Sequence, residues 1–235
     1  MLGPSLNAYN NIPSLFGGDA QNPNHAALPI ECLLVIDSSF SHTTVTPVFN
    51  GRPIQQAIRR LDIGGKFLTN YLKGFVSSRQ YNMSGETYVM NEVKEAVCYV
   101  STDFRHDLGR IGKGVISERP RAILECSKDI VVDYVLPDYN LHNQGCMRPF
   151  DPAKPKRGAL PPGVVVEETM TLGNERFAVP ELLFSPGDVG IMQAGIPEMV
   201  LQSLSGLPQG FWPAMLANVL VVGGNSKISG FMERL

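Results

Sequence analysis

The stretch that decides the fold is Leu33-Leu34-Val35-Ile36-Asp37-Ser38-Ser39-Phe40-Ser41-His42-Thr43-Thr44-Val45-Thr46-Pro47. An apolar strand ends at a single aspartate, a turn of small residues follows, and a β-branched strand comes next, which predicts a β-hairpin. A carboxylate at a strand end can orient a metal-bound water, and the backbone N–H groups of a tight turn can face phosphate oxygens. The stretch therefore predicts a β-hairpin whose turn can face a phosphate, with Asp37 at the end of its first strand.

Composition limits the possible classes of protein. The chain has 235 residues, of which 43% are hydrophobic and 18% charged, which is ordinary for one large globular domain or two small ones. The formal net charge of -2 provides no global field for nucleic acid or a membrane surface. No apolar run approaches the roughly 20 residues that a spanning helix needs, and residues 1–5 lack the basic and apolar regions of a secretory signal.

Cysteine usage points to an intracellular protein. Cys32, Cys98, Cys126 and Cys146 lie far apart and form no C-x-x-C pair. We therefore interpret them as reduced thiols.

Around the hairpin, the pattern predicts both helices and strands. Residues 1–29 are rich in Asn, Pro, Gly and Ser and are interpreted as loop or linker. Residues 140–163 hold five prolines and three glycines and are interpreted as a mobile surface insertion. Helices are expected over 66–79, 86–103, 180–184 and 197–204, and strands over 122–126, 130–136, 164–172 and 217–222. Residues 105–120 show no clear period. A tight turn is expected at Gly223-Gly224, before a short last helix.

Four further segments carry a family resemblance in order and at fitting spacing. They are residues 60–72 (RLDIGGKFLTNYL), 93–100 (VKEAVCYV), 173–177 (GNERF) and 222–226 (VGGNS). With the hairpin, they resemble the actin family. The resemblance implies the second half of the actin-like, ribonuclease H-like ATPase fold, with a mixed sheet, flanking helices and an inserted small helical subdomain.

The resemblance also implies a domain organisation. Residues 1–29 would be a linker from a preceding half, residues 30–80 and 167–235 an α/β subdomain, and residues 81–166 an inserted subdomain that includes the Pro-rich segment 140–163. The last helix is barely one turn long, which is too short to be stable alone. We therefore expect the chain to be cut inside this element.

Carried over residue by residue, the resemblance implies a nucleotide site but no catalytic residue. The residues expected to contact nucleotide are Asp37, Ser38, Ser39, Gly65, Lys94, Glu95, Gly223 and Gly224, and Asp37 would also hold a metal through water. The hairpin turn departs from the family pattern. Phe40 stands where an acidic residue is usual, Ser39 and Ser41 where glycines are usual, and Thr44 where a histidine is usual. A Cβ hinders positive φ and close approach of backbone to phosphate.

The same residues have simpler interpretations. Asp37 could serve only as a turn or cap residue, Lys94-Glu95 as a solvated helix face, and Gly223-Gly224 as a common strand-to-helix turn. Lys154, Lys156 and Arg157 are a nuclear-import or DNA-contacting patch in one interpretation and a solvated loop in the other.

Two functions follow from the resemblance. Within the family, the hairpin turn and the Pro-rich insertion resemble a nuclear subfamily of actin-related proteins. That resemblance implies a non-motor subunit of an SWR-type chromatin-remodelling complex, with complex subunits as partners, the nucleosome as an indirect partner, no membrane, and a location in the nucleus and also the cytoplasm. The alternative is a nucleotide hydrolase or cytoskeletal actin-like protein.

The expected cofactor depends on how much of the cleft is present. ATP or ADP with Mg²⁺ is a candidate cofactor of the full-length protein. No cofactor is expected on this half alone, because half a cleft cannot surround its ligand. Useful hydrolysis is not expected, because several groups that would face the transferred phosphoryl are replaced.

Overall fold

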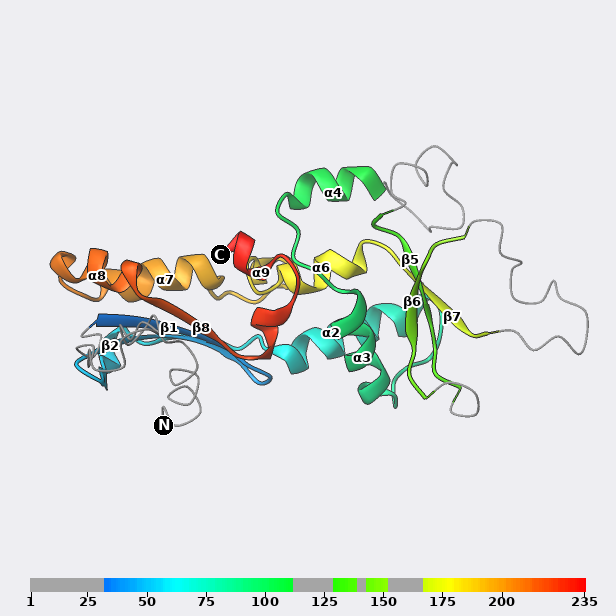
Figure 1. The fold of residues 1–235 in the computed structure, drawn as a ribbon, viewed down its shortest axis with the longest axis horizontal. Coiled ribbons are helices and arrows are strands. Elements are labelled where there is room, and N and C mark those ends of the chain that lie inside the picture. Colours follow the sequence, from blue (N-terminus) through cyan, green and yellow to red (C-terminus); the bar gives the residue numbers. More distant parts are fainter. Residues whose placement is uncertain (1–31, 112–128, 139–142, 152–166) are drawn as a thin grey trace, which may run out of the picture. The chain divides into compact units, whose positions relative to one another are not determined.

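The computed structural model describes residues 32–111, 129–138, 143–151 and 167–235 (Figure 1). These residues divide into two compact units, which are described separately. The first unit contains the described residues of 32–65 and 192–226, and the second those of 66–191 and 227–235. The domain boundaries inferred from the sequence stay a prediction.

The first unit is built on a mixed sheet. Its strands are β1 (Cys32–Ser38), β2 (Thr43–Phe49), β3 (Arg52–Pro53), β4 (Arg59–Leu61) and β8 (Val219–Val222). The order is β3-β2-β1-β8, with β4 also paired to β2. β1 is antiparallel to β2 and parallel to β8, so that Asp37 lies opposite Thr44 on one side and Val222 on the other. The hairpin and the mixed sheet are as the sequence predicts.

The turn after β2 shows how local sequence sets this geometry. Asn50 has a φ of 47° and Gly51 a φ of 73°. Two successive positive φ angles suit a hairpin turn that matches the twist of its strands, and Asn-Gly is the pair that adopts them most readily. The turn therefore fixes the register between β2 and β3.

Helices α7 (Ile196–Ser205) and α8 (Trp212–Ala217) contact the strands of this sheet (Figure 1). Leu34, Ile36 and Val45 are fully buried, and Leu33, Val35, Val48 and Leu220 form a second buried cluster. Consecutive residues of β1 point to opposite faces of the sheet. Both faces of β1 are therefore buried, which rigidly supports Asp37 at its end. Short 3₁₀ turns complete the unit at Gln55–Ala57, Gln209–Phe211 and Gly224–Lys227.

The second unit combines helices with a small antiparallel sheet. The helices are α2 (Gly65–Arg79), α3 (Thr87–Val97), α4 (Phe104–Ile111), α6 (Glu175–Glu181) and α9 (Phe231–Arg234), with a 3₁₀ turn at Pro186–Val189. The strands are β5 (Val132–Val135), β6 (Cys146–Pro149) and β7 (Thr169–Leu172), in the order β6-β5-β7. Buried Phe177 contacts Phe104 edge-to-face, with ring centroids 5.4 Å apart.

The second unit differs from the sequence-based expectation in four places. The helix expected over 180–184 is observed earlier in the chain, as α6 at Glu175–Glu181. α3 ends at Val97 and not at residue 103, because Cys98 is extended and the Val100 amide bonds the Ser229 carbonyl at 2.7 Å. α4 forms where no period was evident. β6 lies inside the stretch expected to be a mobile insertion and pairs with β5. The expected strand over 122–126 lies outside the described residues.

The last helix is short but anchored. Buried Phe231 contacts Phe184, and Arg234 donates to the buried Glu181 carboxylate at 2.9 Å. These tertiary contacts stabilise a helix that could not form alone. Among the described residues, no helix is both long and apolar enough to cross a membrane.

Cys32, Cys98 and Cys146 form no disulfide bond, and Cys126 lies outside the described residues.

Candidate functional site

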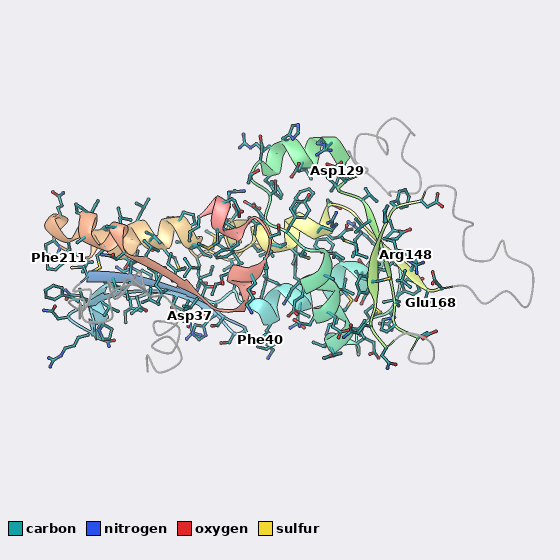
Figure 2. The ribbon with its side chains drawn as sticks, in the orientation of Figure 1. Asp37, Phe40, Asp129, Arg148, Glu168 and Phe211 are labelled. Carbon is teal, nitrogen blue, oxygen red and sulfur yellow. The ribbon has the colours of Figure 1, made fainter. Side chains whose placement is uncertain are left out.

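The candidate site begins at the turn between β1 and β2, where Figure 2 shows Asp37 and Phe40. The Ser39 amide donates to the His42 carbonyl at 3.2 Å and closes the hairpin. The Ser39 hydroxyl donates to Oδ1 of Asp37. One oxygen of the Asp37 carboxylate is therefore engaged within the turn.

Behind the turn, four segments are joined by a directed chain of hydrogen bonds. Thr43 Oγ1 donates to the Ile63 carbonyl at 2.9 Å, so its single proton is used there. Ser38 Oγ lies 3.0 Å from Thr43 Oγ1 and must be the donor of that bond. Asn225 Nδ2 in turn donates to Ser38 Oγ at 3.1 Å. Ser38, Thr43 and Asn225 are all buried, and the chain leaves each of their participating atoms satisfied.

Asn225 also supports the turn directly. Its Nδ2 donates to the Ser39 carbonyl at 2.9 Å, and the same carbonyl accepts from the Gly65 amide at 3.0 Å. A Cβ at Gly65 would lie 3.2 Å from Asn225 Oδ1 and 3.4 Å from Cδ2 of Phe40. The space beside Gly65 is therefore narrowed by Phe40 and Asn225.

The two glycines after β8 have different surroundings. Gly223 has a φ of +99°, and a Cβ there would overlap the Ser38 carbonyl and lie 3.0 Å from Asp37 Oδ1. Gly224 has no neighbour within 4 Å of such a Cβ. Glycine is thus required at position 223 by close backbone packing against the end of β1.

The tip of the hairpin is exposed. Phe40 is 60% exposed, and Ser41 Oγ lies 2.7 Å from His42 Nδ1. The Phe40 and Ser41 amides bond no residue in the part of the chain that the structure describes. Two backbone donors therefore remain available at the tip.

Lys94 and Glu95 lie on α3, in the second unit. Lys94 is buried, and its ammonium donates to Asn91 Oδ1 at 2.9 Å and to Thr69 Oγ1 at 3.1 Å. Burial lowers the pKa of Lys94, partly offset by the nearby Glu95 carboxylate. Glu95 is exposed and accepts from Asn91 Nδ2 at 2.7 Å.

The structure therefore brings together six of the eight predicted residues. The first unit holds Asp37, Ser38, Ser39, Gly65, Gly223 and Gly224, and the second holds the other two. The nucleotide role of these residues stays a prediction.

The second unit also contains a cavity of about 400 Å³ beside Tyr99. Its charged lining groups bond to other groups of the protein. Arg110 Nη2 donates to both carboxylate oxygens of Asp129, at 2.7 and 2.8 Å. Arg176 donates to the Val97 carbonyl at 2.8 Å and to that of Ile130 at 2.5 Å. These bonds hold α3, α6 and the segment before β5 together.

Sequence comparison decides the family to which this hairpin belongs. A family model described as Actin matches residues 2–235. This chain belongs to the actin family. The mixed α/β fold with its mixed sheet agrees with that assignment.

The actin-family relatives are consistent with one subfamily. Actin-like protein arp6 of Aspergillus fumigatus is 57% identical over 100% of this chain and 51% of its own length. Actin-related protein 6 of Neurospora crassa is 48% identical over 100% of this chain and 51% of its own length. Actin-related protein 6 of Drosophila melanogaster is 40% identical over 86% of this chain and 46% of its own length. The chain thus spans about half the length of these curated relatives and is an actin-related protein of this kind.

Actin-family proteins generally bind nucleotide, which brings phosphate groups and a divalent cation to the site. The free amides of Phe40 and Ser41 suit a phosphate group. The Asp37 carboxylate accepts from Ser39 at Oδ1, which leaves Oδ2 for the waters of a hydrated divalent cation. The described residues contain no group of three or more His, Cys, Asp or Glu side chains that could hold a metal ion. The hairpin therefore offers two amides to a phosphate and one carboxylate to the water shell of a cation.

Sequence reasoning missed two residues of this site. Asn225 was quoted only as part of a family segment, and Thr43 only as part of a strand. A polar residue directly after a Gly-Gly turn is the signal that could have singled out Asn225, because such a turn brings the next side chain close to the strand it leaves.

Proposed function

We propose that this chain is part of a non-motor subunit of an SWR-type chromatin-remodelling complex, which exchanges a histone for its variant. The observation that carries the proposal is the 57% identity, over the whole chain, to a protein named actin-like protein arp6. Remodeller subunits would be its direct partners, the nucleosome an indirect one, and the nucleus its main location.

The hairpin supports a structural role and not a motor role. Hydrolysis needs groups aimed in advance at the transferred phosphoryl. Here Asp37 accepts from Ser39, and an exposed phenylalanine occupies position 40. The buried chain from Asn225 to Ile63 favours a rigid platform instead. A nucleotide on such a platform would stabilise the folded state by linkage.

The direct test is affinity purification of the tagged endogenous protein from nuclear extract, followed by mass spectrometry. The proposal predicts recovery of a remodeller ATPase and of subunits that handle the histone variant. Recovery of the protein alone, or with cytoplasmic filaments, would contradict it. An untagged strain, processed in parallel, is the control for adventitious binding.

A second experiment separates the platform from a hydrolase. Phosphate release from ATP is measured for the protein at full natural length and for Asp37→Asn, in which the amide oxygen can still accept from Ser39. The platform predicts the same background release from both proteins. Release well above background that Asp37→Asn abolishes would favour an actin-family hydrolase.

The insertion can be tested without disturbing the sheet. Residues 152–163, the part of the insertion that follows β6, are replaced by a short Gly-Ser linker, which leaves β6 and its partner β5 intact. If the insertion docks a neighbouring subunit, that subunit is lost from the purified complex while the melting temperature is unchanged. Unaltered recovery of every subunit would contradict a docking role.

A further inference from the structure

We propose that the cavity beside Tyr99 binds a small organic carboxylate, whose oxygens accept hydrogen bonds from the Arg176 guanidinium and the Tyr99 hydroxyl. The volume of the cavity, about 400 Å³, is that of a site for a small ligand. Its lining belongs wholly to the second unit and includes none of the residues predicted to contact nucleotide. The inference goes beyond the proposed function and does not depend on it.

The first support is that Arg176 is a buried cation without an ion pair. The residue is 8% exposed and lines the cavity. Its Nε donates to the Val97 carbonyl at 2.8 Å, and its Nη1 donates to the carbonyls of Ile130 at 2.5 Å and Asp129 at 3.1 Å. These acceptors are neutral, and no carboxylate of the described residues forms a salt bridge with this guanidinium. Because an unpaired buried charge is costly, an anion in the cavity would stabilise it.

The second support is that one nitrogen of Arg176 still has donors to offer. Nη2 carries two N–H groups, and its contact among the described residues is with Met147 Sδ, at 4.0 Å. A thioether sulfur is a weak acceptor, so this contact leaves the donors largely unsatisfied. Burial lowers the pKa of Arg176, but a guanidinium keeps its charge in proteins. A carboxylate oxygen is the acceptor that suits such a group best.

The Tyr99 hydroxyl provides a further donor. The Tyr99 ring lies against the Arg176 guanidinium, with the guanidinium carbon 5.1 Å from the ring centroid. The hydroxyl bonds no residue in the part of the chain that the structure describes. Burial raises the pKa of Tyr99 to about 12, so the hydroxyl keeps its proton at neutral pH. The charged groups that act on this hydroxyl all line the cavity: Asp107, Arg176, Asp129 and Arg110.

Two carboxylates in the lining limit the charge of the ligand. Figure 2 shows Asp129 beside the end of α4, where Arg110 Nη2 donates to both of its oxygens. Arg110 Nη1 also lies 3.7 Å from Asp107 Oδ1, and Ser101 donates to Asp107 Oδ2 at 2.6 Å. Both carboxylates therefore have partners, but they still repel an anion nearby. A ligand with one negative charge fits this lining better than a phosphate with two.

The test uses butyrate as the probe, because its hydrocarbon part suits the apolar lining residues Ala96, Val97 and Ile130. Butyramide has nearly the same shape without the charge and is the control ligand. Binding of each to the protein at full natural length is titrated by saturation-transfer NMR at constant ionic strength. Tyr99→Phe removes the hydroxyl, and the matched control is Tyr71→Phe, at a half-buried tyrosine outside the lining.

The expected result is saturable binding of butyrate and none of butyramide. Tyr99→Phe should weaken butyrate binding about tenfold, because a hydrogen bond to a charged group is lost. Tyr71→Phe should bind butyrate as the parent does. Asp129→Asn should bind it more tightly, because a neighbouring negative charge is removed.

No saturable binding of butyrate by the parent would mean that the cavity holds only water, and would overturn the proposal. Equal binding of butyrate and butyramide would overturn it as well, and so would equal affinity of the parent and Tyr99→Phe for butyrate. The melting temperature of Tyr99→Phe checks that the variant folds. If it does not, Asp129→Asn decides, and an affinity no higher than that of the parent contradicts the proposal.

Discussion

The side-chain amide of Asn225 donates a hydrogen bond to Ser38 Oγ at 3.1 Å, across 187 positions of sequence. This bond ties the 3₁₀ turn after β8 to the end of β1, where Asp37 lies. The same amide bonds the carbonyl of the next residue, Ser39. One side chain therefore fixes both the strand end and the turn of the candidate site.

Replacing Asn225 should destabilise the protein. Asn225→Ala leaves the Ser38 and Ser39 acceptors without their donor, at an expected cost of about 1–3 kcal/mol in the free energy of unfolding. Asn225→Asp should cost more, because a carboxylate would face the Ser39 carbonyl. Urea unfolding checks both variants against Asn218→Ala, which removes a single bond to the Ala214 carbonyl. Equal stability of Asn225→Ala and the control would contradict the scaffold.

The direction of the hydrogen-bond chain can be tested at Thr43. Thr43→Val keeps the shape of the side chain but leaves the buried Ser38 hydroxyl and Ile63 carbonyl unpaired, so a loss of about 1–3 kcal/mol is expected. Thr43→Ser keeps the hydroxyl and should retain most of the stability. A Thr43→Ser variant as unstable as Thr43→Val would show that packing, and not hydrogen bonding, matters here.

The two glycines after β8 should respond differently to alanine. Gly223→Ala places a Cβ against the Ser38 carbonyl at a positive φ, and should cost more than about 2 kcal/mol. Gly224→Ala meets open space and is the matched control, with an expected change within about 0.5 kcal/mol. Thermal unfolding of the two variants checks this difference. Similar losses in both would mean that the observed packing at Gly223 is not what requires glycine.

Lys94 should give the stability curve a measurable dependence on alkaline pH. Burial lowers its pKa below the ordinary value of 10.5. Between the lowered pKa of Lys94 in the folded chain and its ordinary pKa in the unfolded chain, only the unfolded chain holds the proton. The free energy of unfolding therefore rises with pH across that window. Lys94→Met should remove this rise.

The Lys94 effect is measured as the difference between parent and variant from neutral pH to about 10.5. The comparison is needed because burial raises the pKa of the Cys98 thiol to about 12. This thiol lowers the free energy of unfolding as the pH rises above its ordinary pKa of 9.0. Subtracting the two curves removes the part of the Cys98 contribution that does not depend on Lys94, since the charges of the two groups also interact. Parallel curves for parent and variant would contradict the burial of a charged Lys94.

The hairpin could be predicted because its determinants are local. An apolar run, a lone Asp37, small turn residues and a β-branched strand each have short-range meaning. The Asn50-Gly51 turn and α2 were predictable for the same reason, since turn chemistry and helical period are written in consecutive residues.

The end of α3 and the presence of β6 could not be predicted, because both depend on partners far along the chain. The apolar pattern continues through Val100, but the Val100 amide donates to the Ser229 carbonyl and not to a carbonyl of α3. β6 has four exposed residues and sits among prolines, so only its pairing with β5 makes it a strand. Strand pairing of this kind leaves no period in the sequence.

The sequence named six residues that the structure brings together in the first unit, but their contacts could not be predicted. Gly223 was expected to contact a nucleotide or to form a tight turn, and the structure shows that it packs against the end of β1. Ser39 was expected to hinder the approach of a phosphate through its Cβ. The structure shows that its hydroxyl also donates a hydrogen bond to the Asp37 carboxylate. Hydroxyl and amide partners cannot be derived from spacing, because they depend on how segments meet in the fold.

We expect this actin-related protein to serve its complex without hydrolysing ATP at Asp37. Recovery of partner subunits from nuclear extract is measured with tagged parent and tagged Asp37→Asn. The same remodeller ATPase and histone-variant subunits should be recovered in the same ratio with both. Loss of those subunits from Asp37→Asn, with its melting temperature unchanged, would refute the non-motor role of the hairpin.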